Sequence, residues 1–245
     1  MRRVLFQWRG ITVWSYPAML YVGLVSGVVV GNIAAHRAGL DALKVYVATI
    51  ILIVPALAGA RLLYVAAEWP TYRGNFRRIW DRNEGGYIMY GGLPLALLFS
   101  LPVLRLLRLP FAAFWDVGVL TILVGMFFTR IGCLLNGCCA GRRCEHWPGI
   151  NLPNSDGAWE KRLPTQVFES LSAAFLLICA LALRRSVPFP GALFLFVSLG
   201  YASTRLLTEF GRERPPGKTH FSIAHVFSLT ILLLSVSTLV IYWRR

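Results

Sequence analysis

Long uncharged stretches recur along this chain and are separated by polar segments that hold most of the charged residues. A helix that crosses about 30 Å of hydrocarbon needs roughly 20 apolar residues, because it rises about 1.5 Å per residue. Seven stretches have this length, and we expect a transmembrane helix over each of residues 15–35, 45–67, 87–104, 112–130, 165–183, 187–209 and 221–243. The pattern predicts an all-α, polytopic membrane protein, a bundle of about seven transmembrane helices.

Composition and charge agree with this interpretation. Of the 245 residues, 56% are hydrophobic and only 15% are charged, which is typical of membrane proteins. A net charge of +14 could indicate a nucleic-acid-binding protein, but the Lys and Arg residues are spread between apolar runs and form no basic domain. We therefore expect membrane lipids as partners, no nucleic acid, and a single transmembrane domain over residues 1–245.

The segments between the expected helices alternate in length. Those after the first, third and fifth helices are short, whereas those after the second, fourth and sixth are longer and hold most of the polar residues. Because functional groups concentrate in long loops, we expect the site on the long-loop side. That side, with the N-terminus, has more Lys and Arg in total, whereas the short loops have the higher density. Charge alone leaves the orientation open.

Charged and titratable residues inside apolar helices are costly, so each is a candidate for function. Arg205, Glu209 and Arg212 are spaced i, i+4 and i+7 and share one helix face, where an anion site or a structural ion pair could form. Arg61, seven residues before Glu68, has the same two interpretations. His225 lies near the start of the last helix and could serve either core hydrogen bonding or catalysis.

A glycine-rich loop follows the fourth expected helix, in residues 129–144, and its glycines permit close approach of a ligand. It holds four of the five cysteines. Four residues separate Cys133 from the adjacent pair Cys138-Cys139, and four more separate that pair from Cys144, a spacing that matches no standard zinc or iron–sulfur motif. We expect no metal here; a disulfide or packed free thiols are both compatible. The paired glycines Gly91-Gly92 in the third helix could admit a lipid, a neighbouring helix or a kink.

In their order, these elements resemble the bacterial prolipoprotein diacylglyceryl transferase family, seven-helix inner-membrane enzymes. Members move a diacylglyceryl group from phosphatidylglycerol to the cysteine thiol of a lipoprotein signal. The resemblance spans roughly residues 16–228. The segments that carry it are Ser15-Tyr16-Pro17, Gly59-Ala60-Arg61-Leu62, Gly91-Gly92-Leu93, Arg130-Ile131-Gly132 through Asn136-Gly137 to Gly141, Pro164-Thr165-Gln166-Val167-Phe168-Glu169, and Arg205 to Arg212.

The resemblance implies a multi-pass transferase of lipoprotein maturation in the bacterial inner membrane, with its N-terminus facing the periplasm. Phosphatidylglycerol and a prolipoprotein signal peptide would be its partners, and the displacement requires no cofactor. It also implies that Arg130 and Arg205 hold the phosphate of the lipid, that Glu209 orients Arg205, and that Tyr16 contributes from the first helix. Further substrate-binding positions by the same resemblance are Arg61, Gly91, Gly92, Asn136, Gly141, Gln166, Glu169 and Arg212.

Three positions depart from the family pattern. The usual histidine before Gly-Gly is Tyr90, and the usual asparagine and glutamate of the loop motif are Cys133 and Cys138. A tyrosine with a pKa near 10 is a poor general base at pH 7, although it can donate a hydrogen bond to the phosphate or the leaving oxygen. Tyr90 and His225 therefore join Arg130, Arg205 and Glu209 as catalytic candidates.

Three hypotheses follow. The leading one is a divergent transferase that uses phosphatidylglycerol, with a lipoprotein cysteine or another acceptor. The second is a lipid-binding or accessory membrane protein without turnover. The third is a thiol redox protein in which a strained Cys138–Cys139 disulfide would favour pairing with Cys133 or Cys144. The transferase leads because arginines retained inside lipid are expensive without an anionic ligand.

Overall fold

The structure is a computed structural model that describes residues 2–81, 86–153, 157–213 and 223–243. All seven expected helices are present, and their bounds are α1 (Ser15–Arg37), α2 (Ala42–Ala67), α4 (Met89–Leu107), α5 (Phe111–Asn136), α6 (Thr165–Leu183), α7 (Ala192–Phe210) and α8 (Ile223–Trp243). The short helix α3 (Trp69–Tyr72) and the 3-10 helix η1 (Phe76–Trp80) lie in the segment after α2. The first two residues of the expected last helix, 221–222, lie outside the described residues. The prediction of an all-α polytopic membrane protein is confirmed.

Six of these helices are long and apolar enough to cross a membrane, as far as the described residues go, and α7 is the exception. The second half of α7 contains Thr204, Arg205, Thr208 and Glu209, which lower its hydropathy. Arg205 and Glu209 are buried in protein, so their charges do not face lipid. By length and composition, six of the described helices qualify as crossings where the sequence predicted about seven, and α7 falls short because its polar residues lower its hydropathy.

Two short β-hairpins accompany the helices, and the hydrophobic pattern did not predict either of them. Strand β1 (Val4–Trp8) pairs antiparallel with β2 (Ile11–Trp14), and β3 (Ile150–Pro153) pairs antiparallel with β4 (Trp159–Arg162). Arg9 and Gly10, between β1 and β2, both have positive φ, as tight two-residue hairpin turns require. Each strand has only four or five residues, too few for an alternating pattern of apolar and polar positions to stand out from the longer runs around it.

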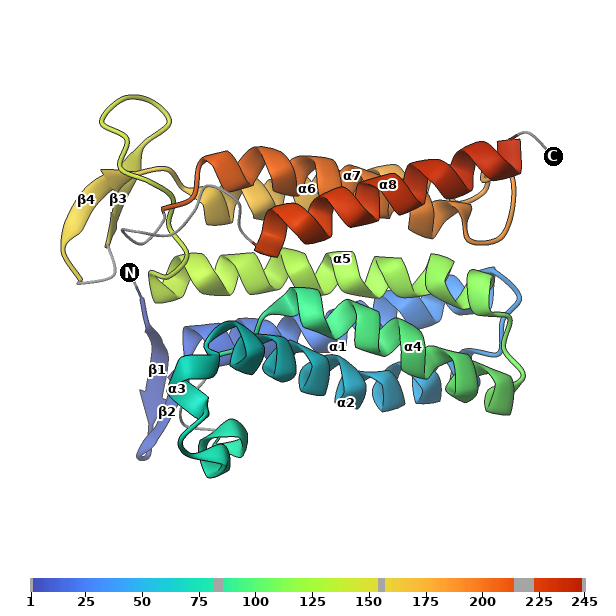
Figure 1. Ribbon diagram of the computed structural model, residues 1–245, viewed down its shortest axis with the longest axis horizontal. Coiled ribbons are helices and arrows are strands. Elements are labelled where there is room, and N and C mark those ends of the chain that lie inside the picture. The colour runs from blue at the N-terminus through green and yellow to red at the C-terminus, as the bar shows by residue number, and fades with distance from the viewer. Residues whose placement is uncertain (1, 82–85, 154–156, 214–222, 244–245) are drawn as a thin grey trace. The chain divides into compact units, whose positions relative to one another are not determined.

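The chain divides into two compact units, Met1–Gly31 with Trp115–Arg245, and Asn32–Phe114. In the first unit α5, α6, α7 and α8 run alongside one another, and the β3–β4 hairpin lies beyond the C-terminal end of α5 (Figure 1). In the second unit α2 and α4 pack against each other along their lengths (Figure 1). The expectation of a single transmembrane domain stays a prediction.

Within the first unit, α1 approaches α5 through glycines at every fourth position, Gly23, Gly27 and Gly31. A Cβ atom on Gly27 would lie 2.6 Å from the carbonyl oxygen of Thr121 in α5, closer than any real contact. Small residues at this spacing let two helix backbones come close together in a membrane, where packing replaces the hydrophobic effect as the driving force. The stripe thus packs the middle of α1 against the middle of α5, between Val117 and Phe128.

Candidate functional site

Glu169 of α6 lies among three arginines of neighbouring segments. Its Oε2 forms an ion pair with Nε of Arg130 in α5 at 2.6 Å. Its Oε1 accepts hydrogen bonds from Nη1 of Arg205 in α7 and from Nη2 of Arg212 just after α7, both at 2.8 Å. Nη2 of Arg205 also pairs with Oε2 of Glu209, one helical turn further along, at 2.8 Å. We call these five residues the arginine cluster; it joins α5, α6 and α7.

The arginine cluster is buried and carries an excess of positive charge. Glu169, Arg205 and Glu209 are buried, and Arg130 and Arg212 are partly covered. Three guanidinium groups face two carboxylates, so one positive charge remains uncompensated within the cluster. The Nε atom of Arg212 is buried and has no hydrogen-bond partner among the described residues. Burying an unpaired charge and a free donor is costly, which favours an anionic ligand at this place.

A small hollow between α5, α6 and α7 opens onto the cluster. Its lining includes Glu169, Arg205, Thr204, Thr208 and Tyr201. Hydroxyl groups and a guanidinium are groups that bind the oxygens of a phosphate or of a glycerol. The hollow is a polar recess between helices that are otherwise apolar, and it is too small to hold a lipid head group as it stands.

The structure brings together several residues that the sequence singled out separately. The i, i+4, i+7 spacing placed Arg205, Glu209 and Arg212 on one face, and they do belong to one cluster. Glu169 lies at the centre of this cluster, a position that spacing within one helix cannot reveal because its three partners come from other segments. The assignment of these residues to phosphate binding stays a prediction.

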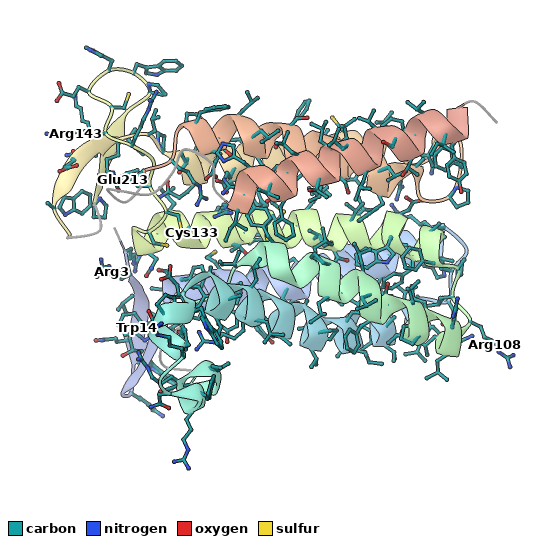
Figure 2. All side chains as sticks on the ribbon, in the orientation of Figure 1. Arg3, Trp14, Arg108, Cys133, Arg143 and Glu213 are labelled. Carbon is teal, nitrogen blue, oxygen red and sulfur yellow. The ribbon has the colours of Figure 1, made fainter. Side chains whose placement is uncertain are left out.

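A second group forms where α5 ends. The Sγ atoms of Cys133, Cys138 and Cys139 all lie within 4.8 Å of one another, and all three cysteines are free. We call them the cysteine trio. Cys133 lies at the C-terminal end of α5 (Figure 2). The backbone of the adjacent pair is held from α6, since Nε2 of Gln166 donates to the Cys138 carbonyl at 2.6 Å and Oγ1 of Thr165 donates to the Cys139 carbonyl at 2.8 Å.

The surroundings shift the pKa values of the Cys138 and Cys139 thiols in opposite directions. Hydrogen bonds from Cys133 and Cys138, with the positive charges of Arg212 and Arg130, hold the pKa of Cys139 well below its usual range. Cys133 also lowers the pKa of Cys138 by a hydrogen bond, but the hydrogen bond with Cys139 and burial outweigh it, so that the pKa of Cys138 is raised. Cys139, the exposed member of the trio, is therefore the one that favours the thiolate.

The loop after the trio is fixed at Gly141 by contacts that only glycine permits. A Cβ atom there would lie 2.5 Å from the carbonyl oxygen of Gly211, at the end of α7. Arg162 in β4, which the sequence analysis missed, is fully buried and donates from Nε to the Gly141 carbonyl at 2.9 Å. Arg162 also forms ion pairs with Glu160, at 3.3 Å, and with Glu213. A charged residue in a polar hairpin gives no hydropathy signal, so its burial was invisible in the sequence.

Tyr16 and Asn136 lie near this end of the first unit. Tyr16 packs on α5, where a Cβ atom on Gly132 would be 3.5 Å from its Cα, and it is within electrostatic range of Arg130 and the trio. The carbonyl of Asn136 accepts a hydrogen bond from Nε of Arg3 at 3.3 Å. Both positions thus border the same region as the arginine cluster and the trio, and their substrate contacts stay predictions.

His225 is buried in α8 and its ring stands edge-on to the ring of Phe210 in α7, with centroids 6.0 Å apart. This contact belongs to aromatic packing between the two helices. A catalytic role for His225 stays a prediction.

In the second unit Arg61 anchors a loop. Its buried guanidinium donates from Nε to the Ile79 carbonyl at 2.8 Å, from Nη2 to the Arg78 carbonyl at 3.0 Å, and from Nη1 to the Gly86 carbonyl at 3.1 Å. The ring of Tyr72 lies 5.5 Å from the same guanidinium. These donors are directed at main-chain oxygens of the segment between α3 and α4, which the sequence did not indicate. Substrate binding by Arg61 stays a prediction.

The paired glycines of α4 serve close packing against α2. Cβ atoms on Gly59 and Gly91 would each overlap the carbonyl oxygen of the other residue, and one on Gly92 would lie 2.8 Å from the carbonyl oxygen of Ala56. Of the three alternatives that the sequence left open, a neighbouring helix is therefore the one the structure contains. Tyr90 is half-buried in the first turn of α4, in the second unit. Lipid contacts of Tyr90, Gly91 and Gly92 stay predictions.

Comparison with known proteins gives the family. The family model described as prolipoprotein diacylglyceryl transferase matches residues 3–242. The phosphatidylglycerol–prolipoprotein diacylglyceryl transferase of Rhodopirellula baltica is 32% identical over 144 residues, which cover 57% of this chain and 29% of that protein. The protein of this name in Clostridium tetani is 24% identical, and the alignment covers 96% of each chain. The protein of this name numbered 2 in Clostridium perfringens is 27% identical, and the alignment covers 95% of this chain and 92% of the relative. Since the match spans nearly its whole length, this chain belongs to the prolipoprotein diacylglyceryl transferase family.

Proposed function

We propose that this chain transfers the diacylglyceryl group of phosphatidylglycerol to the cysteine thiol of a prolipoprotein signal peptide, in the bacterial inner membrane and with its N-terminus facing the periplasm. The observation that carries the proposal is the arginine cluster. Arg205 is buried among apolar helices, Arg130 and Arg212 are partly covered beside it, and the two carboxylates of the cluster balance only two of the three positive charges. Such a site is expensive unless it binds an anion, and a phospholipid head group is the anion that a membrane supplies.

Each member of the cluster has a role in this reaction. Arg130 and Arg205 hold the lipid phosphate. Arg212 adds a further donor, its Nε–H group, which has no hydrogen-bond partner among the described residues. Glu209 orients Arg205 through the 2.8 Å ion pair. Glu169 accepts from all three arginines and so fixes the guanidinium groups before the lipid arrives. Donors that are already in place lose no reorganisation energy when charge develops, which is the main source of electrostatic catalysis.

The chemistry is a displacement at carbon. The acceptor thiolate attacks the glycerol carbon that carries the phosphodiester, a C–S bond forms, and the C–O bond to the phosphate breaks with its electron pair on the oxygen. Glycerol phosphate leaves with an additional negative charge, and the arginine cluster stabilises it. The free thiol has a pKa of about 8.5, so the reaction also needs a group that favours the thiolate. Tyr90 stands where relatives of this family usually have histidine, and a tyrosine is a poor general base at pH 7.

The test is transfer of label from acyl-labelled phosphatidylglycerol to a peptide with a lipoprotein signal cysteine, catalysed by the purified full chain in bilayer discs. The variant Arg205→Ala should lower the rate by about 100-fold or more, because it removes donors aimed at the leaving phosphate. Arg143→Ala is the matched control: Arg143 is exposed and its ion pair with Glu145 is 4.0 Å long, so the rate should not change.

Full transfer by Arg205→Ala would contradict the assigned role of the cluster. If the unaltered chain bound phosphatidylglycerol but transferred nothing to the peptide, the second hypothesis, a lipid-binding or accessory protein, would replace the proposal. The departure at Tyr90 is the specific observation that keeps this alternative in view.

A further inference from the structure

The cysteine trio has the geometry of a metal site, although its spacing along the chain matches no standard motif. The three Sγ atoms converge to within 4.8 Å of one another. Zinc binds thiolate sulfur at about 2.3 Å, so sulfurs around a tetrahedral zinc ion are about 3.8 Å apart. The sulfurs of the trio are therefore within about 1 Å of the separation that a zinc ion requires. A set made only of thiolates selects zinc or similarly thiophilic ions over magnesium or calcium.

The backbone is built to hold the sulfurs together. Cys139 has a φ of 64°, in the left-handed region that non-glycine residues avoid, and Gly137 just before the pair has a φ of 76°. In the described chain only Arg9 and Arg108 are other non-glycine residues with positive φ, and they occupy a hairpin turn and a helix C-cap where such a φ is usual. Cys139 lies neither in a hairpin turn nor at a helix C-cap. Its left-handed backbone lies in the turn where its sulfur converges with those of Cys133 and Cys138.

The surroundings also fit a zinc ion. Three thiolates with a doubly charged cation leave a net charge of minus one, and the positive charges of Arg130 and Arg212 act directly on Cys139. The trio ranges from buried at Cys133 to exposed at Cys139, so an ion would be anchored on one side and accessible on the other. Three protein ligands are what catalytic zinc sites have, with the fourth position left for a substrate.

We propose that Cys133, Cys138 and Cys139 bind a zinc ion whose fourth coordination position takes the thiol of the acceptor cysteine. This inference rests on the proposed function and deepens it, since it names the group that activates the acceptor. A thiol that coordinates zinc loses its proton, so the site needs no separate general base for the acceptor.

The step balances without a redox partner. On coordination the acceptor thiol releases its proton to water. The zinc-bound sulfur then attacks the glycerol carbon of phosphatidylglycerol, one C–S bond forms, and one C–O bond breaks with its electron pair on glycerol phosphate. The thioether product is a weaker zinc ligand than a thiolate, which favours its release. The zinc ion keeps its charge and is ready for another acceptor.

The experiment measures metal binding apart from activity. Full-length protein, purified under reducing conditions in bilayer discs and freed of metal, is titrated with Zn²⁺, and in parallel with Co²⁺, whose absorption bands report thiolate coordination. We expect one ion per chain. Cys138→Ser and Cys139→Ser should weaken binding more than about 100-fold, because each removes a ligand. Cys144→Ser and Cys179→Ser, outside the trio, are the matched controls and should bind as the unaltered chain does.

A second readout addresses the acceptor. Adding a signal peptide with cysteine should increase the cobalt–thiolate charge-transfer band, whereas the same peptide with serine should leave it unchanged. Zinc affinity that is the same in both trio variants, or a disulfide within the trio of the reduced, purified protein, would overturn the site. Full transfer activity by metal-free protein would overturn the acceptor role and leave the proposed function intact. Metal binding with no transfer would retain the site and remove the proposed function.

Discussion

The carboxylate of Glu169 meets the guanidinium of Arg130 at 2.6 Å, between Oε2 and Nε, and this ion pair ties α6 to the last turns of α5. The other carboxylate oxygen of Glu169 serves Arg205 and Arg212. One acidic side chain thus holds three helical segments and the positive charge that the proposed reaction uses. In the proposed reaction, the stability of the protein and the binding of the lipid phosphate would therefore depend on the same residue.

Replacing Glu169 by glutamine should destabilise the protein by about 3 kcal/mol, because the buried Arg205 and the partly covered Arg130 and Arg212 would then be balanced by Glu209 alone. Chemical denaturation in detergent, followed by circular dichroism, measures the change. Glu145→Gln is the control, since the pair of Glu145 with Arg143 is exposed and 4.0 Å long. Equal stability of the two variants would mean that Glu169 does not organise the cluster.

Replacing Arg61 by lysine should loosen the segment between α3 and α4. Lysine keeps the charge but lacks the planar fork that reaches the carbonyl oxygens of Ile79, Arg78 and Gly86. We expect faster cleavage by trypsin after Arg77 or Arg78, which mass spectrometry of timed digests would detect. Arg73→Lys, at an exposed position in the same segment, should leave the rate unchanged. Identical digestion of both variants would refute the anchoring role.

Replacing Gly91 by alanine should separate α2 from α4 and cost about 1–3 kcal/mol, because the new Cβ would meet the main-chain oxygen of Gly59, which cannot move aside as a side chain can. The unfolding midpoint in detergent is the measurement. Gly74→Ala has open space around the added atom and serves as the control. A variant Gly91→Ala as stable as the control would show that the two helices can shift without cost.

Replacing Asp116 by alanine should destabilise the start of α7 by about 1–2 kcal/mol. The Asp116 carboxylate accepts from the backbone N–H groups of Gly191, at 2.6 Å, and Phe194, at 2.9 Å. Asp116→Asn keeps one acceptor oxygen and should lose less. Denaturation of the two variants side by side tests this order; a larger loss for asparagine than for alanine would contradict the capping role, in which the carboxylate oxygens act as acceptors.

The sequence by itself determined where the long helices lie, because a membrane demands about 20 apolar residues for each crossing and leaves no other pattern that fits. It also contains the spacing of Gly23, Gly27 and Gly31, a small-residue stripe that is typical of close helix packing in membranes. The order of its motifs was sufficient to indicate the family, which the match over residues 3–242 then confirmed. Such features are local or periodic, and hydropathy and spacing are sensitive to them.

Only the tertiary structure decided which distant residues meet. Glu169 reaches arginines on three other segments, Arg162 is buried under a polar hairpin, and Arg61 is directed at carbonyl oxygens about 20 residues away along the chain. Cys133 and Cys139 are brought together by the left-handed backbone of the loop, although their spacing argued against a metal site. The physical reason is the same in each case: a buried charge or thiol is satisfied by partners that the fold supplies, and the linear order of residues does not record them.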